Sequence, residues 1–488
     1  MLLASALPGS AADARPKFRP SVIEAPGSQL LACDLDGDRL KDLVLLDGPK
    51  ISVFYQNPGR GFPPQPQLRY SIEDKPALVW AARLGPGPES LLLMTSDGVT
   101  ALLLTNRNGP PARRQIIQRR TLVPQATSEA ASQQSARDPQ GIIVCSMSAR
   151  TAAEWPLLLV PVDGGLEVWR HRQDWERGQT LSGALETHNW PQTQPVGYTR
   201  SSRFSISASD VDGDGREDLM TRVNAAPGTQ LFTLYRQTPE VQFGPEPVMT
   251  CRNDVGRGAW LCWIDLNGDG RIDLIKSAQS ADSWFFPGTR TGKVMAGLHF
   301  ADERGHVPAE PQQMFRKDDS MAALPVLDVD GDGYPDLVLG SAPFDSREGL
   351  RKMITTRQIE VNLGFHFCRP GTGFGKEPDC RARVLIKLDE HAVFLSQSLQ
   401  EYFERCVNCG GDFNGDGRKD LLARDQSGQA SVHFFISREK GFSRKEDLTF
   451  ACPEAIHWLQ PEDLNGDGVS DLIIKTQKRN VCRVFTSQ

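Results

Sequence analysis

The chain has 488 residues, of which 39% are hydrophobic and 24% are charged, and this composition excludes an intrinsically disordered or low-complexity protein. The formal net charge is −6 and there is no basic tract, so nucleic acid is not expected as a partner. No stretch approaches the ~20 consecutive apolar residues that a membrane-spanning helix needs, and we expect no membrane span.

The N-terminal segment reads MLLASALPGSAADA, a short apolar start followed by small residues and an Ala-Asp-Ala cleavage pattern. It is similar to the end of a secretory signal peptide, although it lacks the basic region and the full apolar core of a complete one. We interpret residues 1–14 as a truncated signal peptide, with a disordered tail as the alternative, and residues 15–488 as one domain. The predicted location is extracytoplasmic, and ten cysteines, an even number, are compatible with it.

One acidic ten-residue motif organises the rest of the chain. It reads DLDGDRLKDL from Asp34, DVDGDGREDL from Asp210, DLNGDGRIDL from Asp265, DVDGDGYPDL from Asp328, DFNGDGRKDL from Asp412 and DLNGDGVSDL from Asp463. Successive copies start 51 to 84 residues apart, except for a gap of 176 residues between the first two. Two segments in that gap, 80–99 and 146–165, keep the apolar run that follows the motif but have lost its acids. The sequence therefore predicts eight units.

Each unit shows short apolar runs separated by turn residues, which is typical of β-strands. The first unit reads LLAC, the acidic loop, DLVLL, ISVFY and QLRYSI, which predicts a four-stranded antiparallel sheet. One such sheet cannot bury both of its faces alone and must stack on neighbours. The predicted fold is an all-β, eight-bladed β-propeller, with seven blades as the alternative.

The two ends of the chain predict how the ring closes. After Asp463 only DLIIK and VCRVF precede Gln488, so the last sheet is one strand short. Residues 17–25, KFRPSVIEA, precede the first unit and belong to no other sheet. Because an unpaired edge promotes aggregation, we expect this N-terminal strand to complete the last blade.

The acidic loops have the spacing of a calcium site. Positions 1, 3, 5 and 9 carry Asp or Asn, position 7 offers a backbone carbonyl, and glycines at positions 4 and 6 let the chain curl. Magnesium prefers a tighter octahedron, and the loops hold no His or Cys for zinc. The predicted ligands of up to six Ca²⁺ ions are Asp34, Asp36, Asp38, Leu40 and Asp42; Asp210, Asp212, Asp214, Arg216 and Asp218; Asp265, Asn267, Asp269, Arg271 and Asp273; Asp328, Asp330, Asp332, Tyr334 and Asp336; Asp412, Asn414, Asp416, Arg418 and Asp420; Asp463, Asn465, Asp467, Val469 and Asp471.

The distribution of charge supports a bound cation. The ligand positions hold 21 of the 61 acidic residues, which leaves 40 acids against 55 bases elsewhere. Three or four carboxylates within ~5 Å repel one another without a cation. The alternative is an Asx/Gly turn without metal. The first loop has Arg39 at position 6 in place of glycine, and we expect its site to be weaker.

The motif, the apolar strand after it and a later Gly-Phe loop together resemble the FG-GAP/VCBS repeat, which occurs in integrin α-subunit propellers and in many secreted bacterial proteins. The resemblance covers nearly the whole chain. It implies that calcium binds in the loop joining the first two strands of a blade. It implies no catalytic residue, because the family includes adhesion modules, carbohydrate-binding propellers and polysaccharide lyases.

We therefore expect a secreted, calcium-stabilised propeller that binds a protein or a glycan on a loop-rich face without catalysis. A polysaccharide lyase on the same scaffold and an architectural subunit of a surface assembly are the alternatives. Two insertions, 106–140 and 341–360, are expected to carry specificity. Trp175 and Trp190 could stack on a sugar ring or could simply pack within the fold.

Overall fold

The computed structural model describes residues 16–24, 29–72, 78–107, 109–121, 146–147, 156–182, 184, 204–211, 214–226, 229–240, 242–253, 260–279, 292–303, 307–323, 326–341, 347–387, 406–424, 428–454, 456–476 and 481–488. The proposed signal segment 1–14, Asp212 and Trp190 lie outside these ranges.

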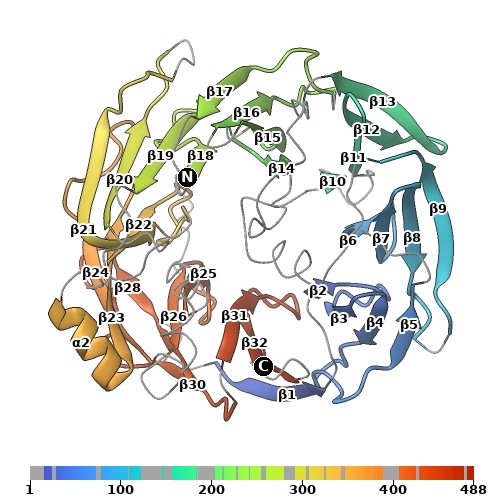
Figure 1. Ribbon diagram of the computed structural model, residues 1–488. Coiled ribbons are helices and arrows are strands. Elements are labelled where there is room, and N and C mark those ends of the chain that lie inside the picture. Colours follow the sequence, from blue (N-terminus) through green and yellow to red (C-terminus); the bar gives the residue numbers. More distant parts are fainter. Residues whose placement is uncertain are drawn as a thin grey trace, which may run out of the picture.

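The described strands form eight antiparallel four-stranded blades that follow one another in chain order around a ring (Figure 1). Blades 1 and 2 contain β2 (Gln29–Cys33), β3 (Asp42–Asp47), β4 (Lys50–Phe54) and β5 (Leu68–Ser71), then β6 (Leu78–Arg83), β7 (Glu89–Thr95), β8 (Gly98–Leu103) and β9 (Ala112–Gln118). Blades 3 and 4 contain β10 (Ser146–Met147), β11 (Leu157–Val162), β12 (Gly165–His171) and β13 (Trp175–Ser182), then β14 (Phe204–Ser209), β15 (Asp218–Ala226), β16 (Thr229–Tyr235) and β17 (Met249–Asn253).

The second half of the ring is built in the same way. Blades 5 and 6 contain β18 (Trp260–Ile264), β19 (Asp273–Gln279), β20 (Gly292–His299) and β21 (Gln313–Ala323), then the end of β21, β22 (Leu337–Ser341), β23 (Gln358–His366) and β24 (Cys380–Lys387). Blades 7 and 8 contain β25 (Val407–Gly411), β26 (Asp420–Arg424), β27 (Ala430–His433) and β30 (Leu448–Phe450), then β31 (Ile456–Glu462), β32 (Asp471–Thr476), β33 (Val481–Ser487) and β1 (Phe18–Glu24). A short hairpin of β28 (Phe435–Ser437) and β29 (Gly441–Phe442) follows β27. The prediction of an all-β ring with eight blades is confirmed, including the two blades that lack the acidic motif.

Blades 5 and 6 share one long strand. The first residues of β21 pair with β20, whereas Ser320 and Ala323 near its end pair with β22. The two blades are therefore hydrogen-bonded into one seven-stranded sheet. The sequence predicted separate sheets at this point, because no signal in it distinguishes a continuous strand from two strands joined by a loop.

The N-terminal strand closes the ring as predicted. β1 pairs with β33 over seven residue pairs, from Phe18 opposite Ser487 to Glu24 opposite Val481. In Figure 1 this blue strand lies beside the red strands of blade 8. Pro20 is exposed on the outer edge, where its missing N–H leaves no partner unpaired.

The core consists of eight separate apolar clusters, one at each junction between neighbouring blades. At the junction of blades 1 and 2, for example, Val44 and Leu46 pack with Leu91 and Leu93. A central strand touches a neighbouring blade on both faces, which explains why DLVLL is buried throughout rather than alternating. Stability therefore depends on contacts between adjacent blades.

Ile23 in β1 provides a test of ring closure. Its side chain is 0% exposed and belongs to the cluster between blades 8 and 1. Because Asp at this position would bury an unpaired charge, we expect Ile23→Asp to reduce the free energy of unfolding by roughly 3–5 kcal/mol. Pro20→Thr, on the exposed edge of the same strand, should have little effect. Equal melting temperatures for the two variants would contradict closure by β1.

The structure locates three of the features that the sequence analysis linked to function. The predicted insertion 106–140 contains β9, the outer strand of blade 2, and residues 122–140 lie outside the described part of the chain. Trp175 is 8% exposed and packs in the cluster between blades 2 and 3, so packing explains it. The insertion 341–360 contains helix α2 (Arg347–Thr356), which lies on the outer rim beside β23 (Figure 1).

The nine described cysteines form no disulfide within the described part of the chain, and seven of them are buried. Burial raises the pKa of Cys409 and Cys482 to about 12, so these thiols stay protonated and unreactive. Among the described residues, no helix is long and apolar enough to cross a membrane.

Candidate metal centre

Each acidic loop joins the first and second strands of its blade. The loop at Asp34 lies between β2 and β3, and the five others occupy the same place in blades 4 to 8. Blades 2 and 3, which lack the motif, have no such loop among the described residues. The location is the one that the family resemblance implies.

Position 1 folds the loop by accepting backbone hydrogen bonds. The carboxylate of Asp412 accepts the N–H groups of Gly415 and Gly417 at 2.7 Å each. The same contacts recur at Asp34, Asp265, Asp328 and Asp463, and Asp210 binds the N–H groups of positions 5 and 6. Positions 4 and 6 require a left-handed backbone, which glycine supplies. Arg39, at position 6 of the first loop, has a φ of 72°, which costs roughly 1–2 kcal/mol.

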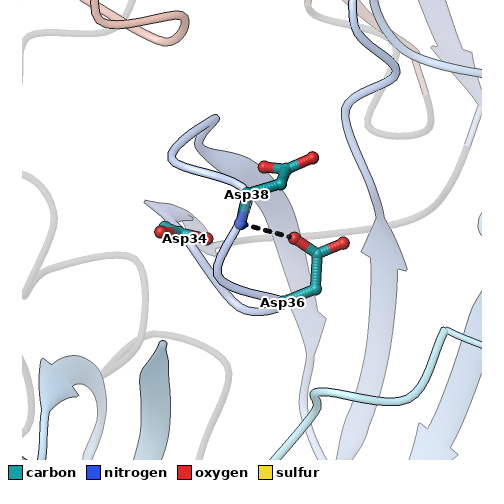
Figure 2. Close-up of side chains that lie close together, drawn as sticks. All are labelled: Asp34, Asp36 and Asp38. Atoms are coloured by element: carbon teal, nitrogen blue, oxygen red, sulfur yellow. Dashed lines mark hydrogen bonds between the residues drawn. The ribbon is translucent and has the colours of Figure 1, made fainter. Parts of the chain in front are cut away.

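In two loops the carboxylates of positions 1, 3 and 5 converge. One oxygen from each of Asp34, Asp36 and Asp38 lies within 4.8 Å of the others. Figure 2 shows these side chains around the turn of the loop, with the backbone N–H of Asp38 donating to Asp36. The residues Asp328, Asp330 and Asp332 form the same kind of cluster.

The loops with Asn at position 3 are arranged differently. There the amide Nδ2 donates to a carboxylate oxygen of position 5, at 3.0 Å from Asn267 to Asp269. Asn414 and Asn465 make the equivalent bonds to Asp416 and Asp467, at 3.1 and 2.9 Å. These loops hold one carboxylate fewer, and part of the charge on position 5 is offset by an amide.

Position 9 has a structural role that the motif did not reveal. Its carboxylate is at most 1% exposed in all six loops and accepts two backbone hydrogen bonds, one from position 2 and one from the end of the third strand. The donor pairs are Leu35 and Gln56 for Asp42, Val211 and Gln237 for Asp218, Leu266 and Ala301 for Asp273, Val329 and Cys368 for Asp336, Phe413 and Phe435 for Asp420, and Leu464 and Ser487 for Asp471. Burial raises the pKa of Asp42, Asp336 and Asp420 to about 7, although both hydrogen bonds oppose this rise.

Position 7 directs its N–H toward position 5 in every loop. The backbone N–H groups of Leu40, Arg216, Arg271, Tyr334, Arg418 and Val469 donate to the position-5 carboxylate at 2.8 to 3.0 Å. Where position 7 is arginine, its guanidinium also binds that carboxylate, as Arg271 binds Asp269 at 2.6 Å. Arg216 and Arg418 form the same pair with Asp214 and Asp416.

Every loop is attached to the following blade. The side chain at position 2 is at most 1% exposed and packs in the cluster shared with that blade; these residues are Leu35, Val211, Leu266, Val329, Phe413 and Leu464. Backbone hydrogen bonds also cross the junction, such as that from Lys419 N–H to Val329 O at 2.7 Å. A change within a loop therefore affects two blades.

The donor set of the loops fits a hard divalent cation. All candidate side-chain ligands are carboxylate or amide oxygens, the ligands that calcium prefers. The side chain of Asp330 is only 6% exposed, and its Oδ1 has no hydrogen-bond partner in the described part of the chain. A buried, unpaired carboxylate oxygen is unfavourable and is available to a cation.

Comparison with known proteins places the repeats in a family. Residues 322–350 match the FG-GAP repeat model, and residues 412–474 match the FG-GAP-like repeat model. With these matches, the acidic repeats of the eight-bladed ring are identified as FG-GAP repeats. No curated protein matches the chain.

Two solved structures have a distant likeness to the chain. One is "Crystal structure of BBS1N in complex with ARL6DN, soaked with mercury", with 10% identity, a TM-score of 0.37, and 97% of this chain and 98% of that chain covered. The other is a lectin of Agrocybe aegerita that recognises non-reducing terminal N-acetylglucosamine, with 12% identity, a TM-score of 0.36, and 77% of this chain and 96% of that chain covered. Both likenesses are too distant to carry an inference about function.

Proposed function

We propose that this protein is an extracytoplasmic, non-catalytic binding module whose acidic loops hold calcium and whose loop-rich periphery binds a protein or a glycan. The FG-GAP propeller fold supports a binding or adhesion module as the general class. The observation that carries the proposal is the common construction of the six loops, each of which packs against the next blade; five of them are also hydrogen-bonded to it in the described part of the chain.

Calcium would supply positive charge where carboxylates gather at a blade junction. Positions 1, 3, 5 and 9 would hold the ion through side-chain oxygens, and position 7 would hold it through its backbone carbonyl. The chain itself orients these groups, because backbone N–H groups fix the carboxylates of positions 1, 5 and 9 in place. An ion held in this way would resist separation of the two blades that the loop joins.

The cysteines are compatible with an extracytoplasmic location. Cys406 and Cys409 are both buried, at 2% and 4% exposure, and neither forms a disulfide within the described residues. Burial also raises the pKa of Cys380 to about 12. Buried, protonated thiols are poor nucleophiles, so an oxidising compartment would not force them into disulfides.

Helix α2 supports a binding role for the rim. It is the one helix among the described residues and stands outside the regular blade pattern. Arg351 and Lys352 are exposed on it, and Ile354 is 54% exposed. A basic, partly apolar surface of this kind suits an acidic glycan or an acidic protein segment.

The test is a glycan array together with cross-linking to envelope proteins, both in calcium. We expect a bound ligand whose affinity falls about tenfold in the Arg351→Glu/Ile354→Ser variant, because one charge contact and one apolar contact are lost. Val248→Ser is the matched control, because Val248 is also an exposed aliphatic side chain, at 57%. Release of unsaturated, ultraviolet-absorbing products from an anionic polysaccharide would instead establish the lyase alternative.

A further inference from the structure

Two of the acidic loops are already contacted by a cation that the neighbouring blade provides. Arg107, which follows β8 in blade 2, places its Nε against Oδ2 of Asp36 and its Nη2 2.9 Å from Oδ2 of Asp38 in blade 1. The Nη2 group also donates to the carbonyl of Gln56 at 3.4 Å. One guanidinium thus joins positions 3 and 5 of the loop across the blade junction.

The same contact recurs on the other side of the ring. Arg438, between β28 and β29 in blade 7, binds Oδ2 of Asp330 through Nε and Oδ2 of Asp332 through Nη2 in blade 6. The hydrogen bond to Asp330 raises the pKa of Arg438, although burial opposes this rise. Among the described residues, these two loops are the ones in which three carboxylates converge.

Both arginines are held in equivalent positions by an aromatic ring. Arg107 lies over Tyr55, 5.2 Å from the ring centroid, and Arg438 lies over Phe367 at 5.4 Å. Each ring immediately precedes the residue, Gln56 or Cys368, whose N–H binds the position-9 carboxylate of that blade. Stacking and paired hydrogen bonds fix a guanidinium more firmly than an exposed ion pair would.

The residue at position 3 correlates with the residue that faces it. In blade 7, Arg438 stands three residues after Phe435, whose N–H binds Asp420. In blade 6 the corresponding residue is Gly371, whose N–H donates to the carbonyl of Asn267 at 3.1 Å. In these loops, aspartate at position 3 is contacted by an arginine of the following blade, whereas asparagine at position 3 is contacted by a glycine of the following blade.

One further loop follows this rule in sequence. Asn465 belongs to blade 8, and the corresponding residue in the following blade 1 is Gly59. For Asn414 in blade 7, the corresponding position in blade 8 would fall after Gln488. Asp212 and the arginine at the corresponding position of blade 5, Arg304, lie outside the described residues.

We propose that Arg107 and Arg438 are the resident cations of the loops at Asp34 and Asp328, so that these two loops join their blades through arginine and calcium binds only at the other loops. The proposal rests on the calcium function proposed above, which it refines. A divalent ion in either loop would need the carboxylates that the guanidinium holds, and two cations within ~5 Å repel each other. The unpaired Oδ1 of Asp330 leaves a latent ligand that would become usable once Arg438 is removed.

The test counts calcium ions per chain by native mass spectrometry on the full chain. We expect at most four ions for the natural protein and up to two more for the Arg107→Met/Arg438→Met variant, because methionine preserves apolar contact without charge. Arg369→Met is the matched control, since Arg369 pairs with Asp379 at 2.7 Å in a similar loop and touches no acidic cluster. Its ion count should equal that of the natural protein.

Five or six ions in the natural protein, or no gain in the double variant when the natural protein binds calcium, would overturn the proposal. If neither protein binds calcium, the proposed calcium function is wrong. The melting temperature in chelator then tests whether the two arginines join their blades. We then expect the double variant to melt at least about 2 °C below Arg369→Met, because two cross-blade contacts are lost. Equal melting temperatures would overturn the arginine proposal as well.

Discussion

Removal of calcium is expected to lower the melting temperature of this protein by about 10 °C or more, and millimolar calcium should restore it. At a free concentration a hundred times its dissociation constant, each ion that binds only the folded chain adds about 2.7 kcal/mol of stability. The effect should be large because several loops are proposed to bind ions and each loop packs against the next blade.

The measurement is a thermal melt followed by circular dichroism, first in chelator and then after addition of calcium. Magnesium at the same concentration should restore less, because it demands a tighter octahedral geometry than these loops provide. Identical melting curves in chelator and in calcium would contradict the proposal that the loops bind calcium.

Loss of a position-9 carboxylate should destabilise the ring even in the absence of calcium. Asp420 is 0% exposed and accepts the N–H groups of Phe413 and Phe435, at 2.7 and 3.0 Å. Asp420→Ala leaves both buried donors unpaired, which should cost about 2–6 kcal/mol. Asp420→Asn should cost less, since its amide oxygen can still accept one of the two bonds.

Two further variants separate this structural role from metal binding. Asp416→Ala, at position 5 of the same loop, should lower the melting temperature mainly in calcium, because its side chain is partly exposed and is a proposed ligand. Asp97→Ala, in the exposed turn between β7 and β8, should change little in either condition. An Asp420→Ala variant that melts like the natural protein in chelator would refute the structural role of position 9.

The fold could be predicted from the sequence because it is repetitive. Six copies of one motif define the length of a unit, and the apolar runs after it define the strands, so even the two blades without acids could be located. Closure by β1 followed from the missing strand of blade 8. The fusion of blades 5 and 6 through β21 could not be predicted, because it depends on backbone pairing of Ser320 and Ala323 rather than on residue type.

The candidate site could be predicted only within a single loop. The motif indicates which oxygens lie near one another, but the partners of those oxygens come from elsewhere in the chain. Arg107 contacts Asp36 from 71 residues away, and Arg438 contacts Asp330 from 108 residues away. Only the strand register of neighbouring blades shows that these arginines occupy equivalent places. The two backbone partners of position 9 could not be found in the motif for the same reason.

The pairing of β1 with β33 means that the ring cannot close until both strands have been synthesised. β1 is made before all the other described strands, and its partner β33 is made after them. Until β33 is made, the early blades have no complete ring to join, and the cluster around Ile23 lacks the residues that blade 8 contributes to it. The nascent chain therefore emerges as an open arc that is exposed to misassembly, and a chaperone that shields its leading end would have most effect in that interval.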